Sequence, residues 1–113
     1  MKFKTTQRGP VTVIALSGSL MGGPDATELN KKVHEFIEGG KNLVVVDLAD
    51  VAFMNSSGLG MLIGCASALK DAEGKLSIAN ASRKILDIIK ITKLSSVLET
   101  HESVQDAIAG LKR

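Results

Sequence analysis

The sequence predicts an α/β fold: a mixed β-sheet of four to five strands, flanked by about four helices. Apolar β-branched runs such as 43–46 alternate along the chain with segments whose apolar residues recur at helical spacing, such as 104–111. The first two runs flank a Gly-Pro turn, so the sheet should open with an antiparallel hairpin and continue in parallel β-α-β units. The length of 113 residues suits one domain, which we place at 1–113.

The hairpin comes first, with strands at 2–7 and 11–16 on either side of the turn. A loop over 18–23 should follow. A helix then begins at Pro24, because proline suits the first helical position, and the glycine pair that starts at Gly39 ends it.

A central strand is expected next, because the run 43–46 is apolar on both faces. It should end at 47–50, and a short linker over 51–56 should lead to a second helix that begins near Ser57. The polar turn 73–75 ends that helix.

The remaining elements repeat the alternation. A strand at 76–79 precedes a third helix capped by residues 80–82, and a short strand is expected around 97–98. The last helix carries the amphipathic stripe within 104–111. The core should be aliphatic and should include Cys65 as a buried, inert thiol.

Composition argues against several classes of function. The net charge is only +2 and aromatic residues make up 3%, which disfavours nucleic-acid binding. His34 should lie on an outward position of a helix and His101 in a surface loop, and both lack partners at metal-ligand spacing. No phosphate-binding or hydrolase motif is present. We therefore expect no enzyme activity, no catalytic residue, no metal and no cofactor. A start without signal-peptide character and the lack of a membrane-length apolar run suggest a cytoplasmic protein.

The second helix has an unusual surface. On a helical wheel, one side gathers the residues expected to pack on the sheet, namely Leu59, Leu62, Ile63, Ala66 and Leu69. The opposite side should be polar but carries Gly60, Met61, Gly64 and Ala68. Either a neighbouring element covers this side, or the backbone of a partner protein approaches it closely.

Two serines stand at the head of this helix, Ser56 and Ser57. One of them should cap the helix, and the other could be a phosphorylation site, since helix N-termini tolerate negative charge. The glycines that follow, from Gly58 to Gly64, loosely match a dinucleotide-binding pattern. The position of the glycines argues against dinucleotide binding. The known pattern turns tightly from the end of its strand, whereas the extended run here ends near Leu48, well before Gly58.

The run Asp47-Leu-Ala-Asp-Val-Ala-Phe-Met-Asn-Ser-Ser-Gly-Leu-Gly60 resembles the signature of the STAS domain of bacterial anti-sigma-factor antagonists, and the similarity extends over the chain. The resemblance implies a protein that binds an anti-sigma factor, which is also a serine kinase, and that phosphorylation switches off. The family's acceptor serine matches Ser56. Asn55 and Met21 stand where the family often has aspartate.

The resemblance and the helix surface together define the expected partner-binding residues: Met21, Asn55, Ser56, Ser57, Gly58, Gly60, Met61, Gly64 and Ala68. An alternative within the same family is a structural subunit of a larger stress-sensing or transport assembly, with no phosphorylation. The sequence does not fix the oligomeric state.

Overall fold

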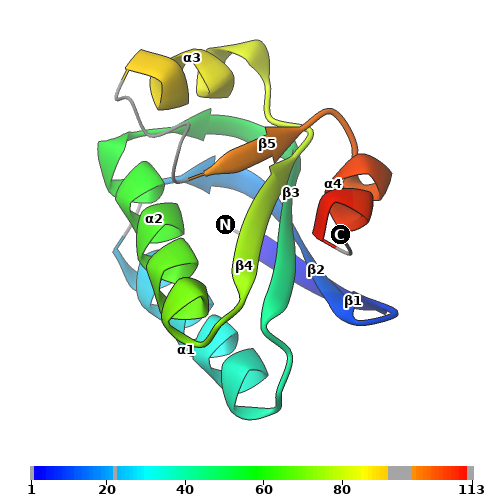
Figure 1. Ribbon diagram of the computed structural model, residues 1–113. Helices are drawn as coiled ribbons and strands as arrows, with labels where there is room; N and C mark the ends of the chain where they lie inside the picture. The colour runs from blue at the N-terminus through cyan, green and yellow to red at the C-terminus, as the bar shows by residue number, and fades with distance from the viewer. Residues whose placement is uncertain (1, 22, 92–97, 112–113) are drawn as a thin grey trace.

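A computed structural model describes residues 2–21, 23–91 and 98–111. A five-stranded sheet forms the centre, with the strands in chain order (Figure 1). The strands are β1 (Lys2–Arg8), β2 (Val11–Leu20), β3 (Leu43–Met54), β4 (Lys75–Ala79) and β5 (Glu99–His101). The helices are α1 (Pro24–Glu38), α2 (Ser56–Asp71), α3 (Arg83–Ile91) and α4 (Val104–Leu111).

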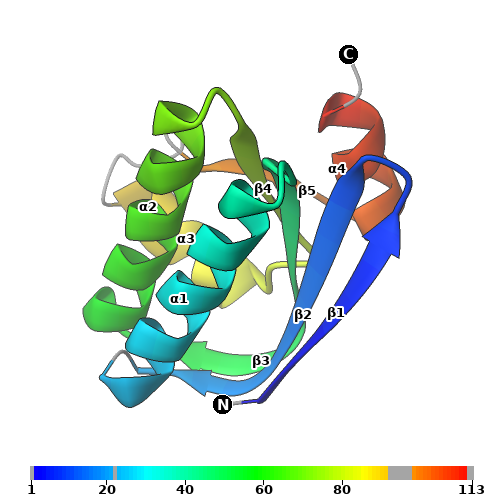
Figure 2. The ribbon, with the colours of Figure 1, turned by 90° about the horizontal axis from the view of Figure 1, so that it is seen from below.

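The predicted topology is confirmed. β1 and β2 form an antiparallel hairpin, and β2, β3, β4 and β5 pair in parallel with their neighbours. Because each crossover advances the sheet by one strand in the same direction, right-handed connections place α1, α2 and α3 in one layer. The last helix, α4, follows β5 and lies on the opposite face (Figures 1 and 2).

Two apolar cores of unequal size hold these layers together. The larger lies between the sheet and the layer of α1, α2 and α3, and includes Leu29, Leu62 and Ile85. The smaller lies under α4, where Ala107, Ile108 and Leu111 meet Val11, Val13, Val45 and Ala79. Cys65 is buried in the larger core, as expected.

The predicted linker at 51–56 is wrong, because β3 runs on to Met54. Its pairing with β2 shifts register twice, between Ala15 and Ser17 and between Gly18 and Ser19. Each shift adds a residue to β3, so apolar side chains spaced by three, Leu48, Val51 and Met54, all reach the core.

Three smaller expectations also need correction. The loop expected from residue 18 begins later, because β2 extends to Leu20. The fifth strand begins at Glu99; Leu98 precedes it as a buried core residue, and Val97 lies outside the described residues. His101 lies in β5 with a side chain only 17% exposed, not in a surface loop. Within the described residues, no helix is both long and apolar enough to span a membrane.

Candidate functional site at the start of α2

The predicted site residues meet at the carboxyl ends of β2 and β3, where α2 begins. The last residues of the two strands, Leu20 and Met54, are register partners. The backbone N–H of Asn55 then donates a hydrogen bond of 3.2 Å to the carbonyl oxygen of Leu20. This bond ties the start of α2 to the end of β2, and so places Met21 close to the two serines.

Asn55, not a serine, caps α2. Its backbone is extended, and its side-chain Oδ1 accepts a hydrogen bond of 2.8 Å from the N–H of Gly58. The expectation that one of the two serines is the cap is therefore wrong. Ser56 and Ser57 are the first two helical residues, and both are exposed.

Gly58 lies inside the fold rather than on its surface. A Cβ built on this residue would stand 2.1 Å from the carbonyl oxygen of Leu20, far inside van der Waals contact. Only glycine lets the first turn of α2 lie this close to the end of β2. Met61 is buried as well, at 8% exposure, so its expected place on the exposed side of the helix is wrong.

Gly60 and Gly64 are exposed, which favours the second of the two alternatives for this side of the helix, and Ala68 is half-buried at its far end. A Cβ built on either glycine would meet nothing within 4 Å among the described residues. Glycine inside a helix is less stable than alanine by roughly 0.5–1 kcal/mol. The fold therefore gives no packing reason for these two glycines.

Phe53 is a surface residue that the sequence analysis missed. Met21 is 49% exposed and Phe53 is 41% exposed, and of the described residues only Ile91 is another large exposed hydrophobic. Phe53 pairs in register with Ser19, two residues before Met21, so both apolar side chains lie at the same end of the sheet. The signal in the sequence was the three-residue spacing of Leu48, Val51 and Met54, which leaves Phe53 facing outward.

Comparison with known proteins assigns the fold. The family model of the STAS domain matches residues 2–107. The chain belongs to the STAS domain family. The anti-sigma-B factor antagonist of Bacillus subtilis (strain 168) is 31% identical over 74 residues, which are 66% of this chain and 67% of that protein.

Two solved structures share the STAS fold over nearly the whole chain. A crystal structure of a candidate anti-sigma factor antagonist from Thermotoga maritima has a TM-score of 0.88 and 20% identity, covering 98% of this chain and 95% of that one. The Bacillus cell-fate determinant SpoIIAA in its phosphorylated form has a TM-score of 0.73 and 21% identity, covering 96% of this chain and 97% of that one.

In this STAS domain, the glycines from Gly58 to Gly64 lie within α2. A dinucleotide-binding loop instead places its first glycines in the tight turn between strand and helix. The dinucleotide interpretation therefore loses its structural basis. None of the nine predicted site residues is charged. Five of them are exposed and offer small polar, apolar and backbone groups for contact: Met21, Ser56, Ser57, Gly60 and Gly64.

Proposed function

We propose that this STAS domain is a cytoplasmic anti-sigma-factor antagonist. It binds an anti-sigma factor that is also a serine kinase, and phosphorylation of Ser56 ends the interaction. The observation that carries the proposal is the exposed Ser56 at the first position of α2, next to a helix side with two exposed glycines. The domain acts by binding, and no catalytic residue is assigned to it.

The relatives support this role. The Bacillus subtilis relative is named an anti-sigma-B factor antagonist, and SpoIIAA, which shares the fold, has been solved in a phosphorylated form. In this chain Ser56 is accessible to a kinase, and neither its hydroxyl nor that of Ser57 is needed as the cap, because Asn55 fills that role.

The effect of phosphorylation follows from charge. A phosphate adds about −1.5 to −2 charge at pH 7. The partial positive charge of the α2 N-terminus tolerates it within the domain. A partner docked on the uncharged site residues would have to bury that charge without a counter-charge among them, at a cost of several kcal/mol. Asn55 caps the helix without adding a second negative charge beside the phosphate, as an aspartate would.

The glycines define how closely the partner approaches. A partner backbone can lie against α2 at Gly60 and Gly64, because neither has a side chain and, in the part of the chain that the structure describes, nothing covers their Cβ positions. Gly64→Arg should abolish binding and leave the fold intact, since Gly64 is exposed and no described residue comes within 4 Å of a Cβ built on it. Gly64→Ala is the matched control and should bind nearly as well as wild type.

The test uses the purified domain and the anti-sigma-factor kinase of the same organism. Binding is measured by calorimetry before and after incubation with ATP, and the modified residue is identified by mass spectrometry. Ser56→Ala should bind and escape regulation, Ser56→Asp should weaken binding with little change in melting temperature, and Ser57→Ala should be regulated like wild type. Phosphorylation at Ser57 alone, or equally tight binding of the phosphorylated domain, would contradict the proposal. Stable binding with no phosphorylation would favour a structural subunit.

A further inference from the structure

Phe53 is the aromatic side chain that the fold leaves uncovered. The chain has no tryptophan or tyrosine, and its aromatic residues are three phenylalanines. Phe3 and Phe36 are partly buried and pack against the larger core, whereas Phe53 is 41% exposed. An exposed aromatic ring forgoes the burial that drives folding, so the reason for Phe53 lies outside the packing of this domain.

The Phe53 side chain points away from the layer of α1, α2 and α3. Leu20 and Met54, which are register partners one residue further along β2 and β3, are both buried in the larger core on that side of the sheet. Successive residues of a strand point to opposite faces. Phe53 and its own register partner, Ser19, therefore face the side of the sheet on which α4 lies.

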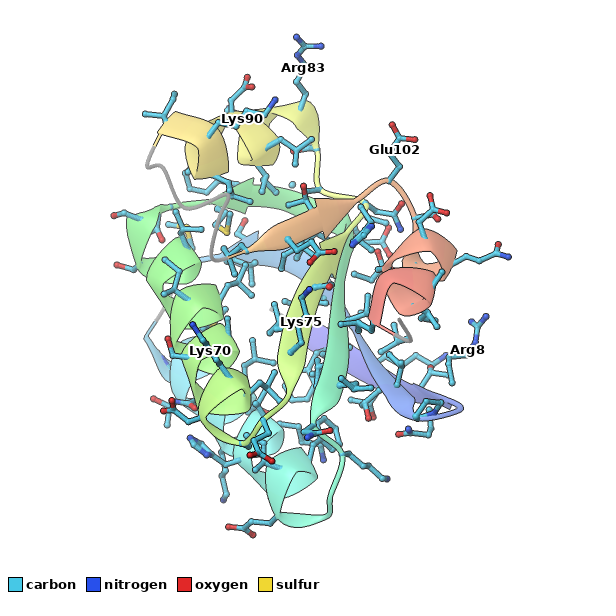
Figure 3. All side chains as sticks on the ribbon, viewed as in Figure 1. Arg8, Lys70, Lys75, Arg83, Lys90 and Glu102 are labelled. Carbon is cyan, nitrogen blue, oxygen red and sulfur yellow. The ribbon has the colours of Figure 1, made fainter. Side chains whose placement is uncertain are left out.

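Helix α4 covers the other end of this face. The β2 and β3 residues of the smaller core, which lies under α4, come from the first halves of their strands: Val11, Val13 and Val45. Residues of α4 line a small hollow together with Arg8 at the hairpin turn, away from the ends of β2 and β3 (Figures 2 and 3). Phe53 therefore stands on a part of the sheet that none of the described helices covers.

This uncovered part of the sheet adjoins the proposed phosphorylation site. Phe53 and Ser56 are three residues apart, so their Cα atoms are separated by at most about 11 Å. Met21, which is 49% exposed, follows Leu20, whose carbonyl oxygen accepts the hydrogen bond from Asn55. An interface of ordinary size, about 800 Å² per partner, includes Met21, Phe53 and Ser56 together.

The neighbours of Phe53 indicate the chemistry that it meets. Ala52 is exposed beside it in β3, and Ser19 is exposed opposite it in β2. Both are small and uncharged, so the ring projects beyond its surroundings and suits a pocket in a partner protein. Buried aromatic side chains of this kind supply much of the affinity at protein interfaces.

We propose that Phe53, assisted by Met21, is the apolar anchor that holds the anti-sigma-factor kinase, and that the kinase has an apolar pocket for it. This inference rests on the proposed function and adds a division of roles, in which Phe53 supplies affinity and Ser56 supplies the switch. The kinase has to hold the domain while the γ-phosphoryl group of ATP passes to Oγ of Ser56, with loss of the hydroxyl proton and release of ADP. An anchor three residues away holds the domain without covering that hydroxyl.

The experiment uses the purified domain and the anti-sigma-factor kinase of the same organism. Calorimetry without ATP measures binding, and steady-state phosphorylation measures KM and kcat. Phe53→Ala should weaken binding about ten-fold and raise the KM for the domain by a similar factor, with kcat unchanged, because an anchor binds equally well before and during the reaction. Met21→Ala should lose about three-fold, since the flexible methionine loses more freedom on binding. Ile91→Ala, an exposed hydrophobic residue at the end of α3, is the matched control and should behave like wild type.

Two further variants separate anchoring from a structural effect. Phe53→Leu keeps an apolar side chain at this position and should recover most of the affinity, with a melting temperature close to that of wild type. Met21 lies outside the strands and helices, so Met21→Ala tests the same contact whether or not Phe53→Ala folds.

Each contrary result has a distinct meaning. Wild-type affinity and KM in folded Phe53→Ala would overturn the anchor and leave the proposed function in place. A lower kcat with unchanged KM would show that Phe53 positions Ser56 and does not hold the kinase. A dimer of the free domain in sedimentation that Phe53→Ala dissociates would show that a second copy covers this surface. A wild-type domain that does not bind the kinase at all would overturn the proposed function, and with it the partner assigned to Phe53.

Discussion

At the scale of single residues, Gly58 and Gly60 lie two positions apart in α2 and are glycines for different reasons. Gly58→Ala would push a Cβ against the carbonyl oxygen of Leu20, so we expect a loss of about 3 kcal/mol or more in unfolding free energy. The Cβ of Gly60→Ala would meet none of the described residues within 4 Å, so this substitution should raise the unfolding free energy by roughly 0.5–1 kcal/mol. Urea denaturation of both variants measures the difference. Equal effects of the two substitutions would contradict the close approach seen at Gly58.

The thiol of Cys65 offers a second test at the same scale. Burial in the core raises its pKa to about 11, because the charged thiolate loses its hydration. At pH 8 the folded protein should therefore react with a disulfide reagent such as Ellman's reagent at least about a hundred-fold more slowly than the unfolded chain. The rates are compared with and without 6 M guanidinium. A fast reaction of the folded protein would show that this part of the core opens readily.

At the scale of elements, the start of α2 depends on its cap. Asn55→Ala removes the acceptor for the N–H of Gly58 and should cost about 1 kcal/mol of stability. Ser57→Ala should cost less than about 0.5 kcal/mol, because this exposed residue lies inside the first turn and does not cap it. Thermal unfolding of the two variants distinguishes them. A larger loss for Ser57→Ala would reverse the assignment of the cap.

The sequence predicted the kind and order of every described element, and failed where the backbone departs from a regular period. Helical spacing and the glycine pair after Glu38 located α1 within a residue. The second half of β3 was missed because its two register shifts replace the two-residue period of a strand with a spacing of three. Because of the same irregularity, the exposed position of Phe53 was not predicted. The cap was assigned to a serine because Asn55 was placed in a linker.

At the scale of the whole molecule, the sequence signature located the surface around Ser56, but no sequence pattern located the hollow of about 600 Å³ at the carboxyl ends of β4 and β5, which is lined by residues such as Asn80 and Asp106. The residues from Asn55 to Gly64 are contiguous, so their grouping was predictable from the chain itself. The hollow combines residues near 80 with residues near 106, which meet only because β4 and β5 pair side by side. No local sequence pattern shows that these two stretches lie close together. Their proximity depends on strand order and on the face of the sheet that each helix covers.

The edge of the sheet farthest from β1 is held by charged groups, and this predicts how the molecule responds to acid. Glu99 forms an ion pair with Lys75 of β4 and a hydrogen bond to His101, beside Gly110 of α4. The contact with Lys75 first, and then that with His101, lowers the pKa of Glu99 below its usual 4.5. The folded state therefore favours the charged carboxylate, and this contribution is present at neutral pH and is lost as the pH falls through the lowered value.

Glu99→Gln measures that contribution as a difference in unfolding free energy from wild type. Because the Glu99 side chain is 41% exposed, solvent weakens the interaction, and we expect the difference at pH 7 to be at most about 1 kcal/mol. It should shrink as the pH falls through the lowered pKa of Glu99, because the wild-type carboxyl then becomes neutral as well. Glu102→Gln, a nearby acid outside the ion pair with Lys75, controls for the change in net charge. A difference that does not shrink as the pH is lowered from 7 until the folded protein is lost would mean that Glu99 acts through packing, because packing, unlike the ion pair, does not depend on ionisation.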